Sequence, residues 1–167
     1  MATPLISIDA RYWRMLSIRW QREPLSGAGA AVAGGRWNRP GQPALYLSLD
    51  HATAVSEFHQ NLVRPGTLAT YQVRSAAIVD FTDPAVAEAY GSASELLYAE
   101  WRSMVALEKV EPLSWRVTDM LVADGAYGLL VPSAQLHAGL NLVLWRWSTE
   151  PDSGAQVELL DPYGDLG

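Results

Sequence analysis

The chain has 167 residues and a formal net charge of −6, from 12 basic and 18 acidic side chains. A chain of this length can bury one core without metal or disulfide support, and the absence of cysteine excludes disulfides, thiolate metal sites and a cysteine nucleophile. The acidic balance argues against direct nucleic-acid binding, which needs a basic stripe. Because Met1 to Asp9 lacks a signal-peptide pattern and no apolar run could span a bilayer, we expect a cytoplasmic protein without membrane contact.

The first strand is expected at residues 10–17, where apolar residues are dense. Residues 27–35 are rich in glycine and alanine, but they lack the third glycine of the dinucleotide fingerprint and the Gly-Lys-Ser/Thr of a phosphate-binding loop. We interpret this segment as a flexible loop that covers a ligand.

A turn is predicted at Asn38-Arg39-Pro40-Gly41, because proline presets φ and glycine permits a positive φ. Residues 44–49 read as a buried strand, and Asp50 is a suitable cap for the helix that follows. The apolar stripe of this helix predicts that it continues until Pro65-Gly66; the stripe consists of Ala54, Phe58 and Leu62.

The second half of the chain places a helical middle between strands. Residues 67–81 predict one bent strand or a tight pair, and Pro84 and Pro112 stand at plausible helix starts. The expected helices are 85–90, 94–104 and 115–122, and the expected later strands are 127–131, 140–147 and 157–160. This order favours a single α+β domain over 1–167, with a motif core at about 12–147 and a C-terminal strand and tail at 156–167.

Several kinds of chemistry find little support in the sequence. The three histidines are not spaced as metal ligands, so no metal is expected, and Ser133 lacks the glycines of a nucleophile elbow. The glutamates of the helical middle read as a solvated face, and the seven tryptophans as core or interface packing.

Arg36, Tyr46 and Glu57 remain as a candidate site, because they lie on three successive elements of different pattern. Singly, each fits an ordinary structural role. Together, an arginine can bind a pyrophosphate, an aromatic ring can stack on a base, and a carboxylate can stabilise an oxocarbenium-like charge. Glu57 borders the apolar stripe of its helix, which could aim it into a cleft. The combination suits scission of the glycosidic bond of a nucleotide.

These residues also carry a family resemblance. The sequence resembles the RES domain in four short runs and in two single residues that stand in order between them, Gly41 and Glu57. The runs are Gly34-Gly35-Arg36-Trp37-Asn38, Ala44-Leu45-Tyr46-Leu47, Val131-Pro132-Ser133-Ala134 and Asn141-Leu142-Val143-Leu144. The arginine, glutamate and serine that give that family its name would be Arg36, Glu57 and Ser133. The resemblance spans roughly residues 12–144.

The resemblance implies an ADP-ribosyltransferase-like fold and a toxin of a type II toxin–antitoxin system. Its substrate would be NAD+, with an Xre-like antitoxin that blocks the active-site cleft. The ADP-ribose would pass to water, to phosphate or to a protein such as a phosphoribosyl-pyrophosphate synthetase. The sequence does not choose among these acceptors, and it leaves a homo-oligomer open.

The resemblance also assigns roles. The catalytic residues would be Glu57 for the ribose hydroxyls and the developing charge, Arg36 for the phosphates or ribose, Tyr46 on the nicotinamide side, and Ser133 to bind the ligand or orient Glu57. The residues that bind NAD+ would be Arg14, Arg36, Trp37, Asn38, Tyr46 and Asn141. The alternative function is a non-catalytic interaction module with an aromatic-rich surface.

Overall fold

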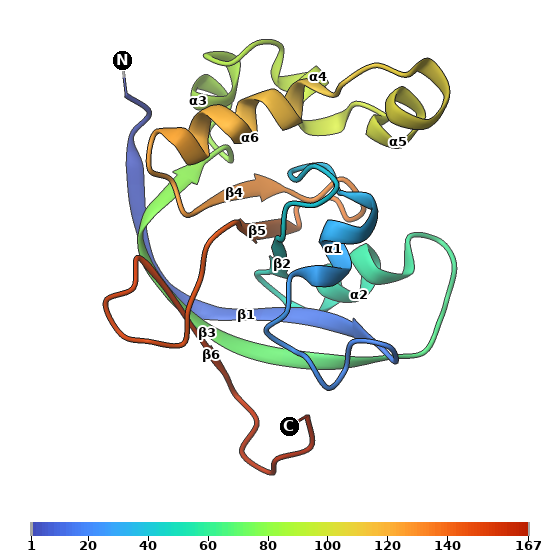
Figure 1. Ribbon diagram of the computed structural model, residues 1–167, viewed down its shortest axis with the longest axis vertical. Coiled ribbons are helices and arrows are strands. Elements are labelled where there is room, and N and C mark those ends of the chain that lie inside the picture. Colours follow the sequence, from blue (N-terminus) through green and yellow to red (C-terminus); the bar gives the residue numbers. More distant parts are fainter. Residues whose placement is uncertain (1, 167) are drawn as a thin grey trace.

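Six strands form one mixed sheet that curls back on itself in the computed structural model, which describes residues 2–166 (Figure 1). The strand order is β1-β2-β5-β4-β3-β6, and a further pairing of β1 with β3 closes the first five strands into a barrel-like core. The strands are β1 (Leu5–Ser17), β2 (Leu45–Ser48), β3 (Gly66–Asp80), β4 (Gly128–Pro132), β5 (Leu140–Leu144) and β6 (Ala155–Leu159).

The long strand β3 organises the sheet. One of its edges pairs with β1 along nearly its full length, from Gly66 opposite Ser17 to Val79 opposite Leu5. Its other edge is shared, because β6 pairs with residues 71–75 and β4 with residues 78–80. The β3–β4 pair is parallel, and the other strand pairs are antiparallel.

The helices of the chain's middle lie together above β4 and β5, whereas α1 and α2 lie lower in the view, with α2 against β1 and β2 (Figure 1). None of the helices in residues 2–166 has the length and apolar character needed to cross a membrane. The helices are α1 (Ala28–Ala33), α2 (His51–His59), α3 (Pro84–Glu88), α4 (Ala93–Tyr98), α5 (Trp101–Ser103), the π-helical turn η1 (Met104–Glu108) and α6 (Leu113–Ala123).

Two apolar cores follow from the alternation of side chains along the strands. On β4, Leu129 and Val131 join the core beneath the helices, while Leu130 joins the core inside the curled sheet. On β5, Val143 faces the helices, and its two neighbours Leu142 and Leu144 face the interior. Both faces of these strands are buried, which explains why they appear in the sequence as continuous apolar runs.

The structure confirms the α+β fold and Asp50 as the cap of α2, where it accepts a hydrogen bond of 2.8 Å from the Thr53 amide. The turn predicted at 38–41 lies one residue later, because the Gln42 amide donates to the Arg39 carbonyl at 3.0 Å, with Gly41 at φ 88°. Pro84 begins α3, and Pro112 immediately precedes α6. Met1 and Gly167, which the single-domain prediction over 1–167 included, lie outside the described residues.

Other expectations were wrong in their boundaries. The stretch 27–35 is not an open loop, because its alanines form the short helix α1. Helix α2 ends before Leu62: Gln60 and Asn61 take left-handed backbone angles of φ 44° and 71°, and Leu62 is 74% exposed. The first strand begins at Leu5 rather than at residue 10, and β5 ends at Leu144 rather than at residue 147.

Candidate active site

A pocket of about 380 Å³ opens on the helix-facing side of β2, β4 and β5. Strand register brings polar side chains to this face, because Ser48 on β2 pairs with Asn141 on β5 and Asn141 pairs in turn with Val131 on β4. Tyr46 and Val143, each two residues along its strand, share the same face. A cavity of this size is within the range of small-molecule sites.

Glu57 projects into this pocket from α2, as its position beside the apolar stripe predicted. Its Oε1 accepts a hydrogen bond of 2.5 Å from Ser133 Oγ and one of 2.6 Å from Asn141 Nδ2. The Asn141 amide is oriented by Ser48, whose hydroxyl donates to Asn141 Oδ1 at 2.8 Å. Both donors reach the same carboxylate oxygen, so within residues 2–166 Oε2 keeps its lone pairs for a ligand.

The Ser133 hydroxyl connects Glu57 to the loop that follows β4. It donates to the carboxylate and accepts from the backbone amides of Gln135, at 3.1 Å, and Leu136, at 3.0 Å. The residue is 8% exposed. Of its two predicted roles, ligand binding and orientation of Glu57, the geometry favours the second.

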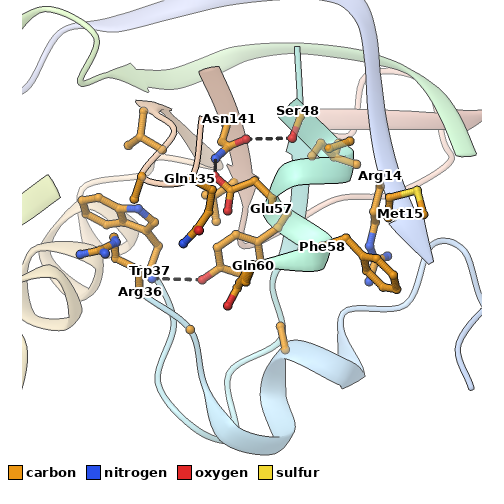
Figure 2. A pocket seen from close by; sticks show the side chains of 18 of the residues that line it. Arg14, Met15, Arg36, Trp37, Ser48, Glu57, Phe58, Gln60, Gln135 and Asn141 are labelled. Carbon is orange, nitrogen blue, oxygen red and sulfur yellow. Dashed lines mark hydrogen bonds between the residues drawn. The ribbon is translucent and has the colours of Figure 1, made fainter. Parts of the chain in front are cut away.

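Arg36 lies on the opposite side of the pocket from Arg14, with Glu57 between them (Figure 2). Its Nη1 donates to the Ala99 carbonyl at 2.7 Å, which ties the side chain to the segment between α4 and α5. Burial lowers the pKa of the Arg36 guanidinium, and the negative charges of Glu100 and Glu57 oppose that shift. An arginine remains charged in such a setting and keeps its other donors for an anion.

The backbone that carries Arg36 is fixed by helix α6. Ser114 Oγ donates to the Arg36 carbonyl at 2.6 Å, and Trp115 Nε1 donates to the Gly35 carbonyl at 2.8 Å. The Trp37 carbonyl accepts from Thr118 Oγ1 at 3.3 Å and from Trp145 Nε1 at 2.8 Å. Three successive carbonyls therefore have side-chain donors, which restrains the loop against rotation.

Tyr46 on β2 packs behind this loop and is hydrogen-bonded to it. Its hydroxyl donates to Asn38 Oδ1 at 2.7 Å and accepts from the Trp37 amide at 3.0 Å. Burial raises the pKa of Tyr46, which keeps the hydroxyl protonated and able to donate. Gly35 is required here, because a Cβ at that position would lie 2.5 Å from the Tyr46 hydroxyl oxygen. Only the Tyr46 ring remains to face a ligand.

The structure changes the reading of two predicted ligand contacts. Asn38 is fully buried and lies outside the pocket lining, and its amide donates to the carbonyls of Ala30 at 3.0 Å and Gln42 at 2.8 Å. Trp37 lines the pocket but is only 3% exposed, and its ring packs against Phe81. Asn38 therefore holds the loop in shape from outside the pocket, and Trp37 borders the pocket with little exposed surface.

Arg14 lines the pocket, and its guanidinium already has partners in the protein. Its Nη1 donates to the carbonyls of Pro24 and Ser26, each at 3.2 Å. Burial lowers its pKa, and Tyr71 opposes that shift. Arg14 thus anchors the segment before α1 as well as bordering the pocket.

Sequence reasoning missed part of the pocket wall. Trp101 and Arg102 come from α5, and Phe58, Arg64 and Gln135 also line the pocket. Phe58 belongs to the apolar stripe of α2, and Arg64 stacks on its ring at 4.0 Å from the centroid. For Trp101 and Arg102 no local pattern could have given the signal, since they reach the pocket by tertiary packing.

The side chains that line the pocket are positively charged overall, whereas the whole chain is negatively charged. Four arginines line the pocket, and among its described lining residues Glu57 is the sole carboxylate, although the whole chain carries a net charge of −6. No group of three or more metal-binding side chains occurs in the described part of the chain. The arrangement suits an anionic ligand that also offers a hydrogen-bond donor or positive charge to Glu57.

Comparison with known proteins agrees with this architecture. The chain is 28% identical over 137 residues to a protein named Toxin Res from Yersinia enterocolitica serotype O:8 / biotype 1B, which covers 79% of this chain and 81% of that protein. Its fold is similar to a chain in the crystal structure of the M. tuberculosis MbcT–MbcA toxin–antitoxin complex, with a TM-score of 0.70 and 24% identity over 94% of this chain and 84% of that one. The profile of the RES domain matches residues 11–166. The chain belongs to the RES domain family.

Proposed function

We propose that this chain is the toxin of a toxin–antitoxin pair and that its pocket cleaves the nicotinamide–ribose bond of NAD+. The observation that carries the proposal is the fixed Glu57 carboxylate, held through Oε1 by Ser133 and Asn141 and facing Arg36 in one pocket. The names of the similar proteins support the toxin role.

The chemistry needs a negative charge at the right place. When the bond between ribose C1′ and the nicotinamide nitrogen breaks, its electron pair leaves with nicotinamide, and positive charge develops on the ribose. A carboxylate that is already oriented stabilises this charge without reorganising during the reaction. In this proposal Oε2 of Glu57 accepts a hydrogen bond from a ribose hydroxyl, because Oε1 already accepts hydrogen bonds from Ser133 and Asn141.

The opposite wall supplies the binding energy for the rest of the ligand. Arg36 binds the diphosphate, and the Tyr46 ring packs on the nicotinamide side. An acceptor oxygen then attacks C1′ and loses its proton; water, phosphate or a protein side chain would give hydrolysis, phosphorolysis or ADP-ribosylation. Under this proposal, an antitoxin that covers the pocket keeps the activity off.

Incubation of the pure protein with NAD+ tests the proposal directly. We expect release of nicotinamide, measured by chromatography, and the mass of the second product identifies the acceptor. Induction of the chain in a bacterial host should lower cellular NAD+ and arrest growth. Absence of release with and without phosphate or cell extract would refute the enzymatic proposal, and tight NAD+ binding without turnover would instead support the non-catalytic module.

A further inference from the structure

Arg102 is held at the pocket by stacking alone. Its guanidinium lies over the Trp101 ring at 4.8 Å from the centroid, and Trp101 packs against Trp115 at 6.4 Å. Trp115 is itself fixed through its bond to the Gly35 carbonyl. Stacking restrains a guanidinium while leaving its N–H groups unused. Within residues 2–166 no hydrogen bond or ion pair reaches the Arg102 guanidinium.

The other pocket arginines are partly satisfied. Arg14 donates to Pro24 and Ser26, Arg64 donates to the Phe58 carbonyl, and Arg36 donates to the Ala99 carbonyl. Arg102 differs, because it is exposed and its guanidinium, which stacks on Trp101, keeps its whole donor set. These donors are available to a partner that enters the pocket.

Arg36 and Arg102 belong to one wall. Arg36 bonds to the Ala99 carbonyl, three residues before Arg102, and both side chains line the pocket. Burial lowers the pKa of Arg36, the negative charges of Glu100 and Glu57 oppose that shift, and the positive charge of Arg102 adds to it as a smaller effect. The two cations therefore repel each other weakly, and an anion bound to both would remove that repulsion. A ligand with two adjacent negative charges would satisfy both.

We propose that Arg102 is a substrate-binding residue and that, with Arg36, it grips the diphosphate of a dinucleotide. Each guanidinium can form two parallel hydrogen bonds to phosphate oxygens, a geometry that lysine does not reproduce. The inference rests on the proposed function, because it assigns the diphosphate of that substrate to a residue outside the predicted site.

Calorimetric titration of two probes tests this assignment. ADP carries a diphosphate, and adenosine lacks one. We expect Arg102→Gln to weaken ADP binding by about tenfold or more, since a hydrogen bond to a charged group is lost, and to leave adenosine binding unchanged. Arg102→Lys should retain part of the ADP affinity. The matched control is Arg19→Gln, because Arg19 also stacks on a tryptophan, Trp20 at 5.1 Å, but lies outside the pocket lining.

Three results would overturn the assignment: wild-type protein that does not bind ADP, equal ADP affinities for Arg102→Gln and Arg19→Gln, or an equal loss of ADP and adenosine in Arg102→Gln. Thermal unfolding of every variant checks that it is folded. ADP binding can be measured without turnover, so the two proposals can fail separately. If the wild-type protein releases no nicotinamide but Arg102→Gln selectively weakens ADP binding, the proposed reaction is refuted and the diphosphate site is retained. If the wild-type protein is active but Arg102→Gln binds ADP as tightly as wild type, the site is refuted and the reaction is retained. In an active enzyme, Arg102→Gln should raise KM for NAD+ more than it lowers kcat.

Discussion

The pocket has two walls that hold their charges by different means. In the carboxylate wall, Glu57 and Asn141 line the pocket, and Ser133 lies behind them, outside the lining. Ser133 and Asn141 donate to the same Glu57 oxygen, at 2.5 and 2.6 Å. In the arginine wall, formed by Arg36 and Arg102, the Arg36 carbonyl is bonded to Ser114 of α6. The Arg36 side chain donates to the Ala99 carbonyl, and the Arg102 side chain stacks on the Trp101 ring.

This difference separates two tasks. A group that stabilises a transition state must be placed accurately before the reaction, and direct hydrogen bonds achieve that placement. A group that binds a diphosphate needs unused donors, so it is restrained by contacts that leave those donors open. We therefore expect changes in the carboxylate wall to affect kcat and changes in the arginine wall to affect KM.

The largest expected effect is that of Glu57→Gln. Glutamine can still accept hydrogen bonds from Ser133 and Asn141 but carries no charge, so kcat for nicotinamide release should fall by about 10²–10³-fold with little loss of stability. Steady-state kinetics and thermal unfolding measure the two quantities. Glu158→Gln, a change at an exposed glutamate of β6, is the control and should behave as wild type. A Glu57→Gln enzyme with near-normal kcat would remove the carboxylate wall from the mechanism.

Next in size is the loss of the groups that orient Glu57. Asn141→Ala and Ser133→Ala should each lower kcat by about 10–100-fold, because each removes one of the two donors to Oε1. The double variant should lose less than the product of the two factors, since both donors act on one carboxylate. Kinetic analysis of this double-mutant cycle tests the point, and strictly multiplicative losses would show that the two residues act separately.

A smaller effect is expected in the arginine wall from Ser114→Ala, which removes the hydroxyl that holds the Arg36 carbonyl. Ser75→Ala is a matched control, because Ser75 Oγ also donates to a backbone carbonyl, that of Gly154, at the same distance of 2.6 Å. Each change should cost about 0.5–1.5 kcal/mol of unfolding free energy. Only Ser114→Ala should also raise KM for NAD+, by a few-fold. Equal KM values in the two variants would contradict a link between α6 and Arg36.

The smallest effect concerns the exposed ion pairs that join the loop after Arg36 to the region of α6. Arg39 bonds to Glu111 at 2.7 Å and to Asp119 at 2.6 Å. Arg39 holds the pKa of Glu111 below its usual range, so the pair stabilises the fold above the ordinary carboxyl pKa and loses this effect as pH falls through the lowered value.

Glu111→Gln should therefore reduce the unfolding free energy at pH 7 by at most about 1 kcal/mol, because the partners are exposed. Urea unfolding at pH 7 and again under acid conditions measures this contribution. The gap between wild type and variant should narrow in acid. A gap that widens in acid would assign the stability to something other than this pair.

The sequence predicted the strands and the α+β class because both faces of the inner strands are buried and their apolar runs are unambiguous. It predicted the direction of Glu57 for a local reason, the position of that residue beside the stripe of a capped helix. It erred at α1, where alanines form a short helix inside a glycine-rich stretch, and at the end of α2, where two residues with left-handed backbone angles set the boundary.

The rest of the site depends on contacts between distant segments. Ser133 lies 76 residues from Glu57, and no spacing rule links them; their pairing was suggested by family resemblance and appears in the structure as a hydrogen bond. Arg102 had no such guide, because its place depends on two tryptophans that stack only in the folded chain. Asn38 is predicted to bind the ligand because it stands in the same run as Arg36. In the structure its buried amide donates to the carbonyls of Ala30 and Gln42 and so fixes the loop.

The one-sided engagement of Glu57 has a consequence for the design of inhibitors. Amidines and guanidines commonly capture a carboxylate through both of its oxygens at once. Here Oε1 already accepts two protein donors, so an amidine could form only one short bond, to Oε2. A compound with a single hydroxyl donor at that point, joined to a diphosphate mimic, would match the acceptor that the pocket offers and would leave no donor of its own buried and unsatisfied.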